Sequence, residues 1–199
     1  MTVSAIIVAA GRSSRFEAGH KLLAKLDGVP LIRYAAASLD ASPITDVVLV
    51  IGADGQAIAD AAGPGRRRVV VNSKAAEGLS TSIQAGLGAL DPASSGAMIV
   101  LADMPGVTSA IITQLCQTFS DTGCKRIVFP QTAEGRQGNP VLWPRALFAE
   151  LMALTGDTGG KAVLAAHKDL HAPVRIDGQA ATFDVDTVAD LENVKDAAR

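Results

Sequence analysis

Runs of consecutive apolar residues alternate along this chain with segments in which apolar residues recur at helical spacing. The strands that these runs predict lie at residues 3–9, 46–51, 69–71, 97–101 and 127–129. Unbroken rather than alternating apolar runs are typical of strands buried on both faces, as in a parallel sheet covered by helices. The pattern therefore predicts an α/β fold: a single-domain, doubly wound, mainly parallel sheet with right-handed crossovers.

The segments between these runs predict turns and helices. Asp27 and Gly28 indicate a turn, Pro30 the first residue of a helix, and Thr108 the N-cap of another helix. A short helix is expected to end near residue 62. The apolar faces of the three clearest helices are Leu31, Tyr34, Ala35, Ser38 and Leu39; Leu79, Ile83, Leu87 and Leu90; and Ile111, Ile112, Leu115 and Phe119.

The last third of the chain is less regular. Polar loops are expected at 135–140 and 156–160, a helix at 161–166, and a late strand at 182–185. Pro144 is expected to begin a helix that carries Leu147, Phe148 and Leu151. Thr187 and Asp190 fit a capping box for a final helix that turns Val188, Leu191 and Val194 inward.

Composition limits the partners and the compartment. With 199 residues, 48% of them hydrophobic, residues 1–199 can bury a full core as one domain. A formal net charge of −2 argues against nonspecific nucleic-acid binding, and no apolar stretch is long enough to span a membrane. The chain runs straight into a strand rather than a leader, and Cys116 and Cys124 form no disulfide framework. A cytoplasmic protein is expected.

The first predicted strand ends in a loop suited to an anion. Small residues at 9–11 let backbone N–H groups approach a ligand, Arg12 and Arg15 can fork onto phosphate oxygens, and Lys21 adds a point charge. Neither the P-loop pattern nor the dinucleotide fingerprint fits this stretch. The alternative is an ordinary strand–helix turn whose charges are solvated.

Three carboxylates are candidates for holding a metal ion. Asp103 follows a central strand, at the sheet edge where ligands bind in open α/β folds. Asp184 and Asp186 lie on the late strand and would point the same way if it is extended. Mg²⁺ needs only one or two carboxylates beside substrate phosphates and water. The alternatives are a turn-forming role for Asp103 and helix N-terminal electrostatics for Asp186.

A series of motifs extends over nearly the whole chain. In order they are A-A-G-R-S-S-R-F at 9–16, K-L-L at 21–23, G-L-S-T-S at 78–82, L-A-D-M-P at 101–105, Q-G-N-P-V at 137–141, G-D-T-G-G at 156–160 and D-V-D-T at 184–187. The series resembles the molybdenum cofactor cytidylyltransferases, within the molybdopterin nucleotidyltransferases of glycosyltransferase-A-like fold. The resemblance implies transfer of CMP from CTP to the phosphate of molybdopterin, with Mg²⁺ and release of pyrophosphate.

The resemblance also implies roles for individual residues. Arg15, Lys21 and Asp103 would be catalytic, and Asp103 and Asp186 would bind the metal, with Asp184 as the alternative to Asp186. The nucleotide would contact Ala9, Ala10, Gly11, Arg12, Ser13, Arg15, Lys21, Gly78, Leu79, Ser80, Ser82 and Asp103. The acceptor would contact Gly138, Asn139, Pro140, Gly156 and Asp157. The N-terminal part would thus bind nucleotide, and about 135–180 would bind the acceptor.

The choice of base and of reaction stays open at this point. The related guanylyltransferases usually carry a second glycine where this chain has Ala10, so cytosine is expected. One alternative is a guanylyltransferase or another phosphate-acceptor nucleotidyltransferase. A non-catalytic alternative is an escort that delivers molybdenum cofactor to an apo molybdenum hydroxylase. The carboxylate pair favours an enzyme, because an escort needs no metal–triphosphate site.

Overall fold

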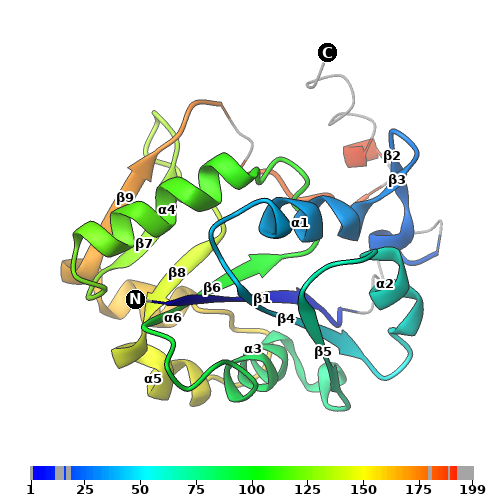
Figure 1. Cartoon of the computed structure of the whole chain (residues 1–199), viewed down its shortest axis with the longest axis horizontal. Coiled ribbons are helices and arrows are strands. Elements are labelled where there is room, and N and C mark those ends of the chain that lie inside the picture. The colour runs from blue at the N-terminus through cyan, green and yellow to red at the C-terminus, as the bar shows by residue number, and fades with distance from the viewer. Residues whose placement is uncertain (1, 12–15, 17–18, 179–180, 188, 192–199) are drawn as a thin grey trace.

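The computed structural model describes residues 2–11, 16, 19–178, 181–187 and 189–191. A seven-stranded sheet forms the middle layer in the order β5-β4-β1-β6-β8-β7-β9 (Figure 1). Its strands are β1 (Val3–Ala9), β4 (Asp46–Gly52), β5 (Arg67–Asn72), β6 (Gly96–Leu101), β7 (Ile127–Gln131), β8 (Val141–Pro144) and β9 (His171–Arg175). Within this sheet β8 alone runs antiparallel to its neighbours. The doubly wound, mainly parallel fold is confirmed.

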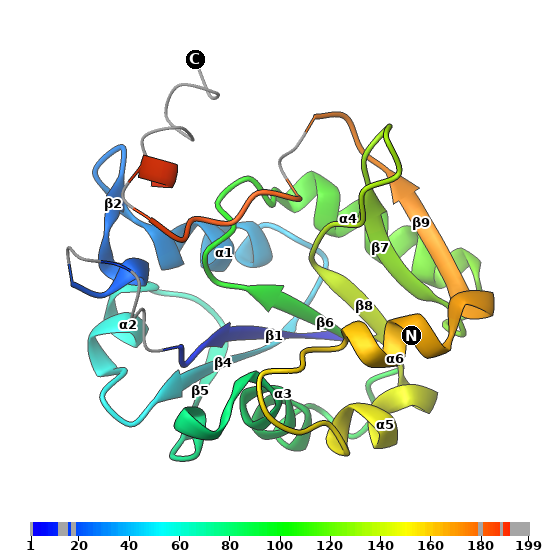
Figure 2. The ribbon, with the colours of Figure 1, turned by 180° about the vertical axis from the view of Figure 1, so that it is seen from behind.

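Helices cover both faces of the sheet. They are α1 (Leu31–Asp40), α2 (Gln56–Ala61), α3 (Leu79–Gly88), α4 (Ser109–Asp121), α5 (Phe148–Met152) and α6 (Lys161–Ala166). Short 3₁₀ helices lie at η1 (Lys21–Leu23), η2 (Ala75–Glu77), η3 (Arg145–Leu147) and η4 (Lys168–Leu170), and β2 (Lys25–Leu26) pairs with β3 (Val29–Pro30) in a small hairpin. Helices α1, α2 and α4 pack on one face, and α3, α5 and α6 on the other (Figures 1 and 2).

The two apolar layers follow from the unbroken strands. Ile6 and Ile7 are adjacent in β1, and both are completely buried because one faces each helical layer. The same holds for Val48 and Leu49 in β4. β5 differs, because it lies at the edge of the sheet and exposes Val69 and Val71. Apolar burial on both faces therefore fixes β1 and β4 inside the sheet.

Several local predictions are confirmed. The turn at Asp27 and Gly28 joins β2 to β3, and the Thr108 side chain caps α4 by accepting from the Ile111 N–H. The capping box holds too, since the Asp190 carboxylate accepts from the Thr187 N–H at 2.7 Å and the Asp190 N–H donates back to the Thr187 hydroxyl. Leu191 is buried as predicted, whereas Val188 and Val194 lie outside the described residues.

Other predictions are wrong. Pro30 is the N-cap of α1 and not its first residue. Pro144 ends a strand, β8, that was not predicted, but it is also the N-cap of η3, and the predicted helical residues Leu147, Phe148 and Leu151 follow in η3 and α5. The strand β9 was also not predicted. Residues 182–185 form no strand in the described structure: the Val185 N–H donates to the Asp103 carbonyl, and the Arg136 guanidinium donates to the Thr182 carbonyl, rather than either pairing with a strand of the sheet. Tyr34 and Ser38, which were predicted on the buried face of α1, are only half-buried. Ile32 and Ala36 complete that face instead.

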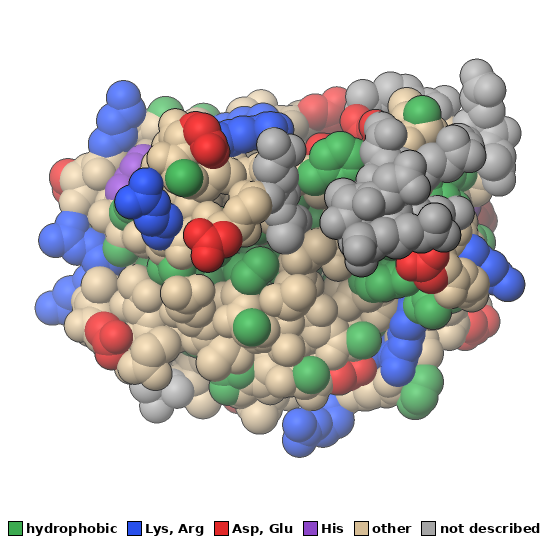
Figure 3. All heavy atoms as spheres, turned by 90° about the horizontal axis from the view of Figure 1, so that it is seen from above, with side chains coloured by type: hydrophobic (Ala, Val, Ile, Leu, Met, Phe, Trp, Pro, Cys, Tyr) green, Lys and Arg blue, Asp and Glu red, His purple; other side chains and the backbone are tan. Residues whose placement is uncertain are grey.

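Charged side chains of both signs lie on the face drawn in Figure 3. Lys and Arg side chains lie mainly around the rim of that face, with acidic side chains among them (Figure 3). Of the helices that the structure describes, none is long and apolar enough to cross a bilayer.

Candidate functional site

Three aspartates converge at the carboxyl end of β6. Asp103 lies just after that strand, and Asp184 and Asp186 lie on the segment that runs past the end of β6 toward the β2–β3 hairpin (Figure 2). The Val185 N–H donates to the Asp103 carbonyl at 3.0 Å, which fixes the two segments together. One carboxylate oxygen from each aspartate lies within 4.8 Å of the others. The predicted convergence of these carboxylates is therefore what the structure shows.

Lys21 neutralises part of this negative charge. Its Nζ donates to Asp103 Oδ2 at 2.7 Å and to Asp186 Oδ1 at 3.0 Å. Burial lowers the pKa of Lys21, but the charges and hydrogen bonds of Asp103 and Asp186 outweigh burial, so that the pKa is raised. The side chain is therefore an ammonium at neutral pH.

His20 holds the segment from which Lys21 projects. Its Nδ1 accepts from the Leu22 N–H at 3.3 Å, at the start of η1. Burial and the neighbouring Lys21 charge lower the pKa of His20, against a hydrogen bond with the Gly11 backbone that raises it. The imidazole is thus neutral at pH 7, which suits its role as an acceptor in this cap.

The aspartates fit a divalent cation. Asp103 Oδ1 is buried and accepts no hydrogen bond from any residue that the structure describes, while Oδ2 binds Lys21. A buried carboxylate oxygen without a donor is energetically unfavourable unless a cation or a donor from a ligand satisfies it. Oxygen-only ligands of this kind suit hard cations such as Mg²⁺ and Mn²⁺.

A small cavity lies at the carboxyl ends of β1, β4 and β5. It has a volume of about 290 Å³ and includes the predicted nucleotide residues Ala9, Ala10 and Gly11. The remaining lining residues were not among the predicted site residues: His20, Gly52, Ala53, Asp54, Gly55, Ile58, Asn72, Ser73, Ala75 and Ala76. The one signal that could have found them is that parallel strands β4 and β5 end at the same edge as β1.

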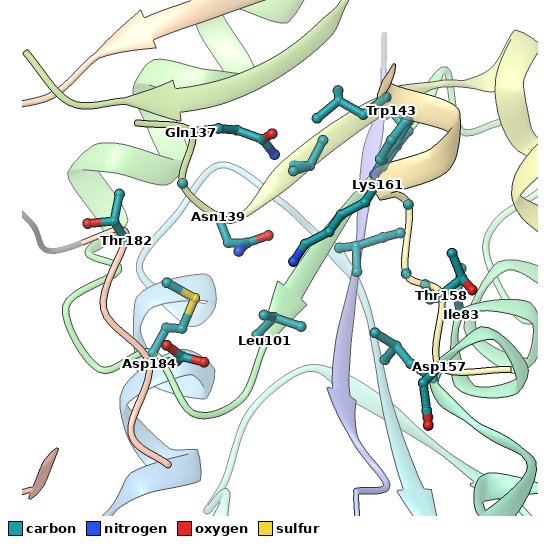
Figure 4. Close-up of a pocket in the computed structure, with 18 of the residues that line it drawn as sticks. Ile83, Leu101, Gln137, Asn139, Trp143, Asp157, Thr158, Lys161, Thr182 and Asp184 are labelled. Atoms are coloured by element: carbon teal, nitrogen blue, oxygen red, sulfur yellow. The ribbon is translucent and has the colours of Figure 1, made fainter. Parts of the chain in front are cut away.

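A larger cavity of about 520 Å³ is lined by β6 and β8. Ile99, Leu101 and Trp143 provide an apolar wall, and Lys161 and Asn139 extend toward its middle from opposite sides (Figure 4). Of the predicted acceptor residues, Gly138, Asn139 and Asp157 line this cavity, whereas Pro140 and Gly156 are adjacent to lining residues. Sequence reasoning missed Arg136, Trp143, Lys161 and Thr182.

The charged cluster adjoins the larger cavity through one of its aspartates, and the residue before its lysine lines the smaller cavity. Asp184 belongs to the carboxylate cluster and also lines the larger cavity. His20, which precedes Lys21, lines the smaller one. A ligand in the larger cavity would therefore lie beside Asp184, and a ligand in the smaller cavity would lie beside the residue that precedes Lys21.

Residues 5–171 match the family model described as the MobA-like NTP transferase domain. The chain belongs to this family. The nucleotidyltransferase assignment predicted from the sequence is thereby confirmed, and the fold agrees with it.

Known relatives of this MobA-like chain differ in length and in name. It is 26% identical to the nicotine blue oxidoreductase of Paenarthrobacter nicotinovorans over 95% of the chain and 94% of that protein. It is 31% identical to the bifunctional protein GlmU of Sinorhizobium fredii over 67% of the chain, but covers only 30% of GlmU. Rv0371c of Mycobacterium tuberculosis H37Rv has a similar fold, with a TM-score of 0.84 at 23% identity and 98% of each chain covered, and a second structure of Rv0371C is a manganese complex.

The G-L-S-T-S motif of this MobA-like domain lies between the two cavities. Leu79 lines the larger one, and the side chains of Ser80 and Ser82 are buried. Gly78 packs against Gly156. The predicted nucleotide contacts of this motif stay a prediction, as do those of Arg12, Ser13 and Arg15, which lie outside the described residues.

Proposed function

We propose that this protein transfers CMP from CTP to the phosphate of molybdopterin or molybdenum cofactor and releases pyrophosphate. The observation that supports this most is the Asp103–Asp184–Asp186 cluster with Lys21: Asp184 lines the larger cavity, and His20, next to Lys21 in the chain, lines the smaller one. A nucleotidyl transfer requires two ligands that meet at one charged centre, and membership of a nucleotidyltransferase family supports this reading.

The division of the chain follows the two cavities. In this proposal the N-terminal part holds the nucleoside in the smaller cavity, beside Ala10 and Gly11, and about 135–180 holds the acceptor in the larger one. The triphosphate then extends toward Lys21. Two N–H groups of the Lys21 ammonium donate to Asp103 and Asp186, which leaves the third for a phosphate oxygen. Arg15 is proposed to bind the same triphosphate.

The chemical step needs orientation more than proton transfer. A phosphate oxygen of the acceptor attacks the α-phosphorus of CTP, and the bond from that phosphorus to the pyrophosphate oxygen breaks. The attacking phosphate is already an anion, so no strong protein base is required, and the chain contributes alignment and positive charge. Mg²⁺, when bound, would neutralise part of the negative charge on the phosphates.

Asp103 and Asp186 are the proposed ligands of Mg²⁺. Both contact Lys21, whereas Asp184 is exposed and lines the larger cavity. Asp184 is therefore closer to the acceptor, and Asp186 is the better second ligand. Asp103 Oδ1 is buried and has no hydrogen-bond donor among the described residues, so a bound cation would stabilise this oxygen most.

Ala10 is the proposed reason for preferring a pyrimidine. It is only 7% exposed and lines the smaller cavity, so its methyl group narrows the space beside the base. A purine would need the extra room that glycine leaves. We place the reaction in the cytoplasm, with an apo molybdenum hydroxylase as the recipient of the product.

The test is a product analysis with purified protein. Incubated with CTP, Mg²⁺ and molybdenum cofactor, it should release pyrophosphate and form the cofactor carrying CMP, which mass spectrometry detects in equal amount. Omission of the cofactor should stop pyrophosphate release. Formation of a GMP adduct from GTP, with none from CTP, would show that GTP is the nucleotide substrate. Release of pyrophosphate without any nucleotidylated cofactor would show that molybdenum cofactor is not the acceptor.

A further inference from the structure

One continuous segment joins the linings of the two cavities. Its first part lines the smaller cavity with Asn72, Ser73, Ala75 and Ala76, and its second part lines the larger cavity with Leu79 and Ile83. Gly78 lies at the change from one to the other, as the N-cap of α3 with φ at +119°. Only glycine adopts this backbone conformation without strain.

Gly78 makes a backbone-to-backbone contact with the loop at 155–160. A Cβ atom at Gly78 would lie 2.2 Å from the carbonyl carbon of Gly156 and 2.7 Å from the Asp157 nitrogen. The Ser80 N–H donates to the Gly156 carbonyl at 3.1 Å. Because both contacts are to backbone atoms, a change of side-chain rotamer in the loop cannot make room for a side chain at position 78.

Helix α3 fixes the same loop at two further points. Gln84 Nε2 donates to the carbonyls of Met152 at 3.0 Å and Leu154 at 2.8 Å, just before the loop. Within the loop, a Cβ at Gly159 would lie 3.1 Å from Leu79 Cδ2. Asp157, Thr158, Gly159 and Gly160 of this loop all line the larger cavity.

The other end of the segment is fixed separately. The buried Asn72 donates from Nδ2 to Thr81 Oγ1 at 2.9 Å and to Ser82 Oγ at 3.0 Å. Asn72 therefore connects the smaller cavity to α3, but the contact with the 155–160 loop is made by Gly78 and Ser80, and Gln84 holds the two carbonyls just before it.

We propose that Gly78 is a positioning residue for the acceptor: it sets the 155–160 loop against α3 and thereby shapes the larger cavity. This inference rests on the proposed two-cavity transfer reaction. It assigns the start of G-L-S-T-S to acceptor binding, whereas the sequence resemblance assigned the motif to the nucleotide. A substitution at Gly78 moves the acceptor loop and leaves in place the ends of β1, β4 and β5, which form most of the smaller cavity.

The first test compares Gly78→Ala with Gly88→Ala. Gly88 is at the other end of α3, and a Cβ there meets no atom within 4 Å, so it controls for adding a methyl group to this helix. In pyrophosphate-release assays Gly78→Ala should raise the KM for molybdenum cofactor at least tenfold and change the KM for CTP less than twofold. Gly88→Ala should alter neither. A raised KM for CTP with an unchanged KM for the cofactor would overturn the inference.

A second variant covers a failure of Gly78→Ala to fold. Gln84→Glu keeps the side-chain shape but removes the amide donor to Met152 and Leu154. Amide hydrogen exchange at 152–160 should become at least tenfold faster, with exchange at 67–72 unchanged. Equal exchange rates at 152–160 in Gln84→Glu and the unmodified protein would show that the contacts from α3 do not hold the loop, and would reject the positioning role. Hydrogen exchange can be measured without turnover. If the unmodified protein released no pyrophosphate, the proposed function would be rejected, but the exchange data would still show whether α3 holds the loop in place.

Discussion

At the scale of single residues, one lysine is shared by two carboxylates. Lys21 contacts both Asp103 and Asp186, and its raised pKa keeps it charged throughout the neutral range. The ammonium holds the two acids near each other, although their like charges repel. Lys21 therefore organises the site in addition to its proposed contact with phosphate.

Replacement of Lys21 tests this shared role. Lys21→Ala should lower kcat/KM for CTP by at least tenfold, or about 1.4 kcal/mol, because a charge that meets phosphate in ground state and transition state is removed. The affinity for CTP should fall as well, as titration calorimetry would measure. Lys168→Ala, an exposed lysine before β9, is the matched control. Unchanged affinity and unchanged rate would show that Lys21 does not reach the triphosphate.

The base preference is also a single-residue property. CTP should exceed GTP in kcat/KM by at least tenfold, about 1.4 kcal/mol, with molybdenum cofactor as the acceptor. Ala10→Gly should narrow this ratio by admitting a purine, without reversing it. Steady-state kinetics with both nucleotides measure the ratio. A wild-type preference for GTP would contradict the steric argument at Ala10 and favour the guanylyltransferase alternative.

At the scale of elements, the parallel strands are joined by polar contacts at the edge away from the site. Asp46 begins β4 and accepts from the Ser4 hydroxyl of β1 at 2.6 Å and from the Asp91 N–H at 3.0 Å. Its other oxygen pairs with Arg68 of β5 at 2.5 Å. Burial alone would raise the pKa of Asp46, but these hydrogen bonds and the Arg68 charge lower it.

This arrangement predicts a pH-dependent stability without an effect on catalysis. Asp46→Asn should lower the free energy of unfolding at pH 7 by about 1 to 3 kcal/mol, as expected for hydrogen bonds to a charged group. Because the folded pKa lies below the unfolded one, the stabilisation is complete above about pH 5 and is lost as pH falls through the folded pKa. Urea unfolding of both proteins should therefore converge at acid pH, with kcat at pH 7 unchanged. A difference that stays constant down to pH 3 would contradict this assignment.

The elements that sequence predicted best are those with both faces buried. β1, β4 and β6 are unbroken apolar runs, and their burial fixes their identity. β8 is short and lies between Pro140 and Pro144, which indicate loops and helix starts when read alone. β9 contains Pro173, which a strand tolerates only at an edge, and sequence does not reveal that β9 is the last strand of the sheet.

The candidate site was predictable to the same extent. Asp103 and Lys21 follow recognisable elements, and their convergence with Asp186 was foreseen although the strand expected to carry Asp186 is absent among the described residues. Residues 52–55 and 72–76 were not foreseen, because they are small or polar and approach Ala10 only through the parallel pairing of β4 and β5. Trp143 was missed for the same reason, since its place in the cavity depends on β8.

At the scale of the whole molecule, the sheet brings distant segments to one edge. Residues near 10, 21, 103 and 186 meet there, although most of the chain separates the first from the last. The smaller cavity lies at the ends of β1, β4 and β5, and the larger one is lined by β6 and β8, the next strands in the sheet. The central claim is that this edge transfers a nucleotidyl group with a cation held by Asp103.

The most direct measurement of that claim is Mg²⁺-dependent pyrophosphate release by Asp103→Asn and by the unmodified protein. Asn keeps the shape of the side chain but removes the charge that the cation and Lys21 require, so kcat should fall by about a hundredfold or more. Circular dichroism should show an unchanged fold, and Asp169→Asn, an exposed aspartate of η4, should keep full activity. Near-normal, Mg²⁺-dependent turnover by Asp103→Asn would contradict the account.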